Sequence, residues 1–119
     1  MSEIRLNVIT REWVIIATER AKRPSDFKNN KDKNHLPHYL ASCPFCPGNE
    51  HKTPPELFRI PDGENWKIRV VSNKFSALSP DGAKTRDEDG GLARTVSGVG
   101  FHEVIIETTA HDLTTGLLD

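Results

Sequence analysis

The feature that most restricts the fold of this chain is a proline-rich segment that holds both of its cysteines. Between Cys43 and Pro55 the sequence has four prolines and a glycine, a density that excludes a regular helix. The two cysteines are Cys43 and Cys46, and they form a single C-x-x-C. We therefore expect a loop here, with two thiols close together on a tight turn.

The C-x-x-C favours a metal site over the other uses of paired thiols. Two thiolates on a tight turn can point at one tetrahedral ion. A redox C-x-x-C normally opens a helix whose N-terminus lowers the pKa of the thiol, and Pro47-Gly48 disfavours a helix directly after Cys46. Inert buried thiols are the remaining alternative. Zinc takes four ligands, so the other two would have to be histidines or carboxylates.

Five histidines could complete such a site: His35, His38, His51, His102 and His111. His35 and His38 fall in a polar loop, where we expect them to be solvated, and His51 follows the cysteine segment on a polar stretch. His102 lies within a predicted strand and His111 just past its end, where an imidazole can be presented across a sheet. Spacing alone leaves both open, and a purely structural histidine is the alternative for either.

Strand patterns account for most of the apolar residues. Short connections between them indicate antiparallel order. The residues at 104–106 are apolar on consecutive positions, which predicts burial on both faces. The expected strands are a hairpin of residues 5–9 and 13–17, then 56–60, 66–71 and 100–107.

Two polar segments separate these strands and are predicted to be loops. The first covers residues 25–38, and the second covers residues 79–97, with Asp81-Gly82 and Gly90-Gly91 as breakers. After the last strand Asp112 could cap a helix that continues to Leu118. The sequence stops before that helix completes two turns, so we expect an incomplete domain.

Length and charge exclude several classes of protein. The chain has 119 residues, and 16 Lys+Arg against 17 Asp+Glu leave a net charge of −1. This balance argues against nucleic-acid or membrane-surface binding driven by net charge. No apolar run approaches the roughly 20 residues of a membrane helix, and the N-terminus lacks a secretory pattern. We expect a cytoplasmic, single-domain protein with a thin core, because only 35% of its residues are hydrophobic.

Two further clusters have the chemistry to bind a nucleotide. Three cations in the segment 20–24 suit a phosphate oxyanion, although a solvated basic turn fits equally well. Asn73 and Lys74 end a predicted strand, where the amide could bond a ribose or base and the ammonium a phosphate. An ordinary Asn turn is the alternative. The sequence contains neither the P-loop nor the dinucleotide fingerprint.

Four blocks in this order resemble the N-terminal part of the galactose-1-phosphate uridylyltransferase family, within the histidine-triad superfamily. They lie at residues 5–24, 43–50, 69–78 and 100–111. The resemblance implies an α+β fold, with an antiparallel half-barrel sheet and few helices. It also implies that residues 1–119 are the N-terminal part of an incomplete domain, and that the complete protein is a homodimer.

The resemblance also implies roles for individual residues. Cys43, Cys46 and His111 match three of four zinc ligands, which places His111 ahead of His102. In the family, one stretch contacts the phosphates of the nucleotide sugar, partly across the dimer interface. The residues that match this stretch are Arg20, Ala21, Lys22 and Arg23. Contacts to the nucleotide sugar match Lys52, Asn73 and Lys74, although other members often have Asp at the position of Lys74.

The implied activity is ping-pong uridylyl transfer. A histidine attacks the α-phosphorus of UDP-glucose, and galactose 1-phosphate then takes the uridylyl group from the histidine. The nucleophile belongs to a His-Pro-His motif, and no histidine in this sequence precedes a proline. The fourth zinc ligand, just before that motif, is also missing, so we expect these 119 residues to be inactive alone.

Two alternatives remain open at this level. One is an ADP-sugar nucleotidylyltransferase or phosphorylase of the same superfamily, since the residues at 100–103 are shared among such relatives. The other is a non-catalytic zinc-binding fragment.

Overall fold

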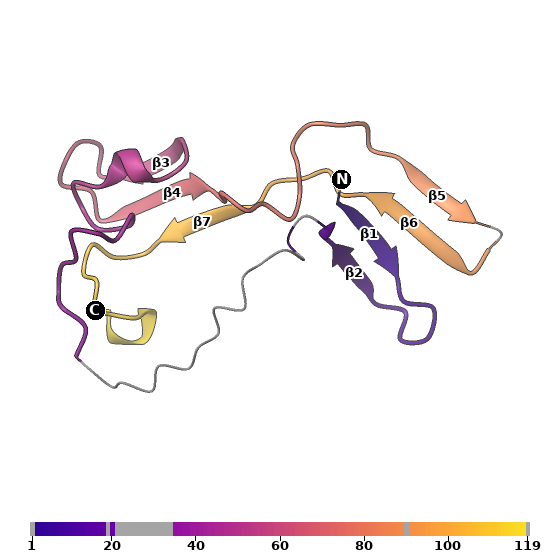
Figure 1. Cartoon of the computed structure of the whole chain (residues 1–119), viewed down its shortest axis with the longest axis horizontal. Helices are drawn as coiled ribbons and strands as arrows, with labels where there is room; N and C mark the ends of the chain where they lie inside the picture. Colours follow the sequence, from indigo (N-terminus) through magenta and orange to yellow (C-terminus); the bar gives the residue numbers. More distant parts are fainter. Residues whose placement is uncertain (1, 19, 21–34, 90, 119) are drawn as a thin grey trace. The chain divides into compact units, whose positions relative to one another are not determined.

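A computed structural model describes residues 2–18, 20, 35–89 and 91–118 of the chain (Figure 1). The chain forms two compact units. One consists of Met1–Lys28 and Phe75–His102, and the other of Asn29–Lys74 and Glu103–Asp119. Each unit has its own antiparallel sheet. The expectation of an antiparallel, helix-poor fold is therefore confirmed, with the strands divided between two sheets.

The sheet of the first unit has the strand order β2-β1-β6-β5. The predicted N-terminal hairpin is confirmed, with Ile4 opposite Ile15. Its first strand ends earlier than expected because the Asn7 side chain accepts hydrogen bonds from the amides of Ile9 and Thr10. The strands are β1 (Glu3–Leu6), β2 (Trp13–Ile16), β5 (Arg86–Asp89) and β6 (Ala93–Ser97).

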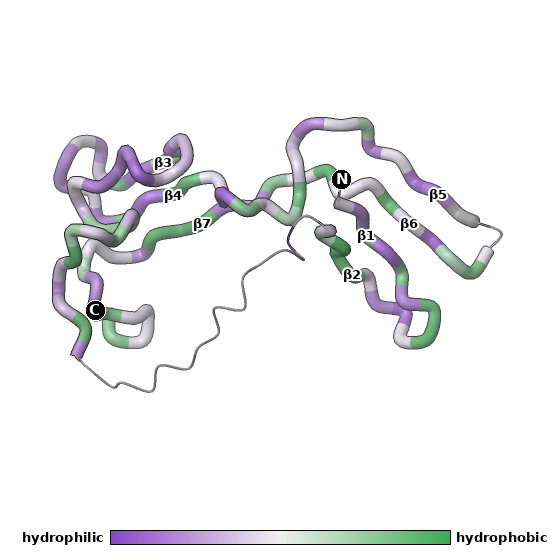
Figure 2. Tube along the Cα trace, viewed as in Figure 1, coloured by the Kyte–Doolittle hydropathy of each residue, from purple (hydrophilic) through white to green (hydrophobic). Residues whose placement is uncertain are grey.

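The prediction of a loop over residues 79–97 is wrong, because β5 and β6 form a hairpin there. Strand β6 pairs with β1 on one side and β5 on the other, so that Thr95 faces both Arg5 and Asp87. Strand β5 has the sequence Arg-Asp-Glu-Asp, and the part of it that is coloured in Figure 2 is hydrophilic. Backbone pairing at a sheet edge, rather than apolar burial, makes it a strand. Gly91, at a φ of 108°, belongs to the turn between the two strands.

The sheet of the second unit has the order β3-β4-β7 and contains the strands expected near 56–60, 66–71 and 100–107. Its small core consists of Trp66, Val71 and Ile106. The elements of this unit are the 3-10 helix η2 (Glu50–Lys52), β3 (Glu56–Ile60), β4 (Ile68–Ser72), β7 (Glu103–Ile106) and the 3-10 helix η3 (Thr115–Leu117).

The predicted burial of β7 on both faces is wrong. This strand lies at the edge of its sheet. Ile106 is 8% exposed and packs in the core, while Ile105 is 66% exposed. Only one face of the strand is covered by the described residues, so the side chains alternate as in any half-buried strand.

The predicted helix after His111 is also not found. The described residues there form turns followed by η3, a single 3-10 turn. Gly116 in the middle of this segment, and two β-branched threonines before it, weaken helix formation. Within the described ranges, no helix has the length and apolar character needed to cross a membrane.

Candidate metal centre

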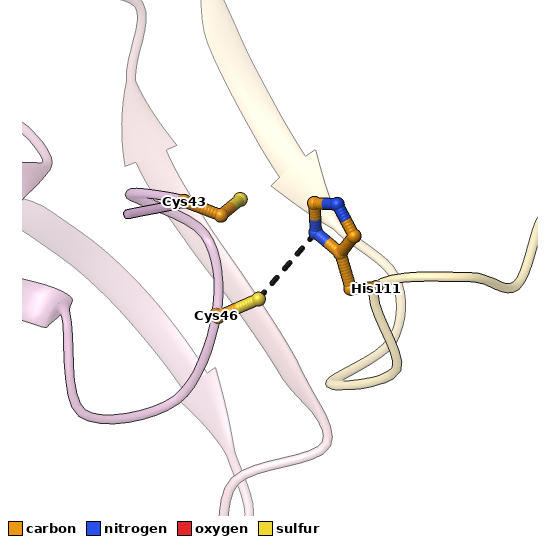
Figure 3. Close-up of side chains that lie close together, drawn as sticks. All are labelled: Cys43, Cys46 and His111. Atoms are coloured by element: carbon orange, nitrogen blue, oxygen red, sulfur yellow. Dashed lines mark hydrogen bonds between the residues drawn. The ribbon is translucent and has the colours of Figure 1, made fainter. Parts of the chain in front are cut away.

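Cys43, Cys46 and His111 lie together in the second unit (Figure 3). Their ligand atoms are all within 4.8 Å of one another. Cys46 Sγ is 3.5 Å from Nδ1 of His111, although the two residues are 65 positions apart in the sequence. Cys46 is buried, and the other two side chains are partly buried. A single ion could therefore contact all three residues.

The two cysteines lie on a tight turn, as expected from the prolines. The amide of Cys46 donates to the carbonyl of Cys43, and the amide of Asn49 donates to the carbonyl of Cys46. Gly48, which lies between Cys46 and Asn49, has a φ of 89°, and a residue with a side chain would be strained in this conformation. These backbone bonds turn both thiols to the same side, toward the imidazole (Figure 3).

Asn49 braces this turn, a role that the sequence analysis missed. Its side chain is buried, and Nδ2 donates to the carbonyls of Ala41 at 3.0 Å and Cys43 at 2.8 Å. Lys52 Nζ donates to the same Ala41 carbonyl. An Asn directly after Pro-Gly is the signal that could have identified the brace. The structure thus places Lys52 against the cysteine loop.

His111 is positioned by the segment that follows β7. The hydroxyl of Thr108 accepts a hydrogen bond from the amide of Ala110, which is buried. The amide of His111 then donates to the carbonyl of His38 at 2.9 Å. The hollow at the site has a volume of about 260 Å³, and it is lined by Cys43, Phe45, Cys46, Thr108, Thr109, Ala110 and His111.

A buried arginine joins the cysteine segment to the sheet. Arg69 is 1% exposed. It donates to Glu56 Oε1 at 3.0 Å and to the hydroxyl of Thr53 at 3.1 Å. Its guanidinium lies 5.3 Å from the centre of the Trp66 ring, within cation–π range. Trp66 in turn donates to Glu50, and this hydrogen bond lowers the pKa of that carboxyl.

The Glu56 carboxylate gives the second unit a predicted dependence on acid. Hydrogen bonds from Arg59, and then from Arg69, lower the pKa of Glu56 below its ordinary value of 4.5. A depressed pKa stabilises the folded state above the unfolded value, and this stabilisation is lost as the pH falls through the folded value. We expect urea midpoints to drop below about pH 4.5. Glu56→Gln should be less stable at neutral pH but lose less on acidification; an unchanged acid slope in this variant would contradict the assignment.

Arg20 and His102 line a separate cavity within the first unit. Arg20 Nε is buried and has no hydrogen-bond partner among the described residues. His102 Nδ1 accepts a hydrogen bond from the amide of Ala77 at 3.0 Å, and it does not belong to the group around Cys43. The cavity measures about 290 Å³ and is lined by Ile15, Ala17, Arg20, Ala77, Leu78, Phe101 and His102.

The remaining expected site residues are placed as follows. Asn73, partly buried, and Lys74, exposed, follow the last residue of β4. Each of the two residues interacts with another group in the structure. Ala21, Lys22 and Arg23 lie outside the described residues.

Comparisons with known proteins identify the family. A sequence model of the galactose-1-phosphate uridyl transferase N-terminal domain matches residues 1–119. ADP-glucose phosphorylase of Arabidopsis thaliana is 44% identical over 113 residues, 93% of this chain and 32% of the relative. Galactose-1-phosphate uridylyltransferase of Haemophilus influenzae is 32% identical over 115 residues, 96% of this chain and 32% of the relative.

A solved structure agrees with these sequence matches. The crystal structure of an ADP-glucose phosphorylase from Arabidopsis thaliana, with bound ADP-glucose, covers all of this chain and 32% of its own length, at 35% identity and a TM-score of 0.51. The chain thus spans about a third of the length of these relatives. Since the family's N-terminal domain model covers every residue, the chain belongs to the galactose-1-phosphate uridyl transferase family.

Proposed function

We propose that the whole protein transfers a nucleotidyl group from ADP-glucose to inorganic phosphate. The observation that carries this choice is the 44% identity to an ADP-glucose phosphorylase over 93% of the chain. Transfer from UDP-glucose to galactose 1-phosphate, expected from the sequence, is the second candidate. It is supported by the family model and by the 32% identical uridylyltransferase.

Both candidates share one chemical scheme. A histidine nitrogen attacks the α-phosphorus of the nucleotide sugar, the bond to the β-phosphate breaks, and the sugar 1-phosphate leaves. An oxygen of the phosphate acceptor then attacks the same phosphorus and releases the histidine. Covalent catalysis divides one difficult displacement into two easier ones. The nucleophile lies outside these 119 residues, which contain no His-Pro-His.

Within the chain, Arg20 is the residue best placed to bind a phosphate of the substrate. Its Nε is buried beside the cavity and lacks a hydrogen-bond partner among the residues described. A buried guanidinium donor is costly to leave unpaired, and phosphate oxygens are strong acceptors for arginine. Ile15, Leu78 and Phe101 line the same cavity and would give the sugar or base of the substrate an apolar surface beside that contact.

We further propose that Cys43, Cys46 and His111 hold a structural zinc ion. Tetrahedral bonding at typical Zn–S and Zn–N lengths separates a sulfur from a nitrogen ligand by about 3.6 Å. The observed distance between Cys46 Sγ and His111 Nδ1 is 3.5 Å, so the donors fit the ion. With a fourth ligand from elsewhere in the protein, zinc would fasten the cysteine turn to the segment after β7.

The proposed reaction is tested by comparing two donors with two acceptors. The whole protein is incubated with ADP-glucose or UDP-glucose, each with phosphate or galactose 1-phosphate, and nucleotide products are quantified. We expect the highest kcat/KM for ADP-glucose with phosphate, and ADP as the product. Faster transfer from UDP-glucose to galactose 1-phosphate would favour the second candidate, and no transfer in any combination would contradict both. The 119-residue chain is the control and should be inactive.

The homodimer implied by the family resemblance also remains a proposal. Light scattering of the whole protein should give twice the mass of one chain. A monomeric mass at assay concentrations, with full activity, would contradict it.

A further inference from the structure

We infer that His38 and Asp112 are positioning residues that hold the metal ligand His111 against the cysteine turn. His38 Nδ1 donates to Asp112 Oδ1 at 2.9 Å, and the His38 carbonyl accepts the amide of His111 at 2.9 Å. His38 therefore bonds to two consecutive residues, one of which is the ligand. We call this pair of hydrogen bonds the His38 clip. The inference rests on the metal site proposed above.

The clip joins the two parts of the site directly. His38 lies five residues before Cys43 and precedes the cysteine loop without an intervening element. That loop is already fixed internally, because the amide of Cys43 donates to Leu40 and Asn49 donates to Ala41. On the other side, Asp112 is the residue directly after His111. Fixing residue 38 to residues 111 and 112 therefore sets the distance between thiols and imidazole.

A clip of this kind raises metal affinity by pre-organisation. Without it, metal binding must itself order two segments that are remote in sequence, and this ordering opposes binding. Outer groups that orient ligands commonly contribute to affinity in metalloproteins. The His38 and Asp112 side chains are 76% and 35% exposed, and exposed pairs contribute little. We therefore expect about a two- to fivefold effect on affinity rather than loss of binding.

His38 itself does not have the position of a ligand. The donor group within 4.8 Å consists of Cys43, Cys46 and His111, and Nδ1 of His38 is bonded to a carboxylate instead. A role in positioning and a role in ligation predict different spectra, which makes them separable by experiment.

The test measures metal binding by the metal-free whole protein, which supplies the fourth ligand, with Co²⁺ as a spectroscopic probe and with Zn²⁺ in competition with a chelator. The disrupting variants are His38→Ala, Asp112→Ala and the double variant, all of which remove the side-chain bond of the clip and keep its backbone bond. His38→Asn retains a donor near the position of Nδ1 and serves as the conservative rescue. His35→Ala is the matched control, because this histidine is also exposed and lies three residues earlier.

We expect each disrupting variant to bind Zn²⁺ two- to fivefold more weakly, the double variant no more weakly than either, and His38→Asn and His35→Ala to resemble the wild type. The Co²⁺ bands should keep their wavelength and intensity. Metal-induced stabilisation, measured as the Tm difference between loaded and metal-free chain, should shrink. A purely structural role would instead lower both Tm values equally.

Three results would overturn the inference, and they differ in what else they affect. Unchanged affinity in the disrupting variants would refute the positioning role of the His38 and Asp112 side chains and leave the metal site intact. Altered Co²⁺ bands in His38→Ala would make His38 a ligand rather than a positioning residue. Failure of the wild-type whole protein to bind either metal would refute the clip together with the proposed site.

Discussion

Replacing Arg69 by alanine is expected to destabilise the second unit by about 2–5 kcal/mol, the range typical of truncating a large buried side chain to alanine. Arg69 is 1% exposed. Its loss leaves the hydroxyl of Thr53 without a donor it now has, removes one partner of Glu56, and opens a void beside Trp66. Three energetic terms therefore act in the same direction.

Urea unfolding followed by Trp66 fluorescence measures the stability of the second unit, to which Trp66 belongs. The only other tryptophan, Trp13, lies in the first unit, so a Trp13→Phe background isolates the signal. Arg59→Ala is the matched control, since Arg59 also binds Glu56 but is more exposed than Arg69. We expect a clearly smaller shift of its midpoint. Equal losses in both variants would show that the Glu56 bond alone, and not burial, determines the effect.

Replacing His111 by alanine is expected to lower zinc affinity by at least about 100-fold. This exceeds the 10- to 100-fold losses seen when only outer groups are removed, because His111 supplies one of three donors within 4.8 Å. In the whole protein, zinc content after dialysis against a weak chelator should fall from near one ion per subunit to near zero. Metal analysis of the purified variants measures this directly.

His102→Ala is the control for this loss. It removes a histidine of the first unit, whose Nδ1 accepts a bond from Ala77, and zinc content should stay at the wild-type level. Zinc at the wild-type level in both variants would remove His111 from the site. Zinc loss in both, with a lowered Tm of the metal-free forms, would show misfolding instead of loss of a ligand.

The sequence predicted those parts of the fold that depend on local chemistry. Prolines and Gly48 predict the cysteine turn, and alternating apolar residues predict β3 and β4. The hairpin β5–β6 was missed, because β5 has no apolar residue and exists through backbone pairing with a strand that itself pairs with β1. Hydropathy patterns cannot detect a strand of this kind, which depends on partners far away in the sequence.

The candidate site also combines features that local sequence predicts with features that depend on distant residues. The cysteines were recognisable from spacing, but the choice of His111 over His102 came from family resemblance and not from pattern. The supporting bonds depend on backbone groups that the pattern does not bring together: Asn49 donates to the carbonyl of Ala41, and the carbonyl of His38 accepts the amide of His111. His38 was expected to be merely solvated. It is exposed, yet it is bonded to Asp112, and exposure alone did not reveal this.

The separation of 65 residues between Cys46 and His111 has a consequence for the unfolded chain. A metal ion held by both would be a reversible cross-link around a loop that includes β3, β4 and β7. Closing a loop of this size removes conformational entropy from the unfolded ensemble worth about 4 kcal/mol by the relation used for disulfides. A chelator would then act as a reductant does on a disulfide protein, because removal of the cross-link returns this conformational entropy to the unfolded chain.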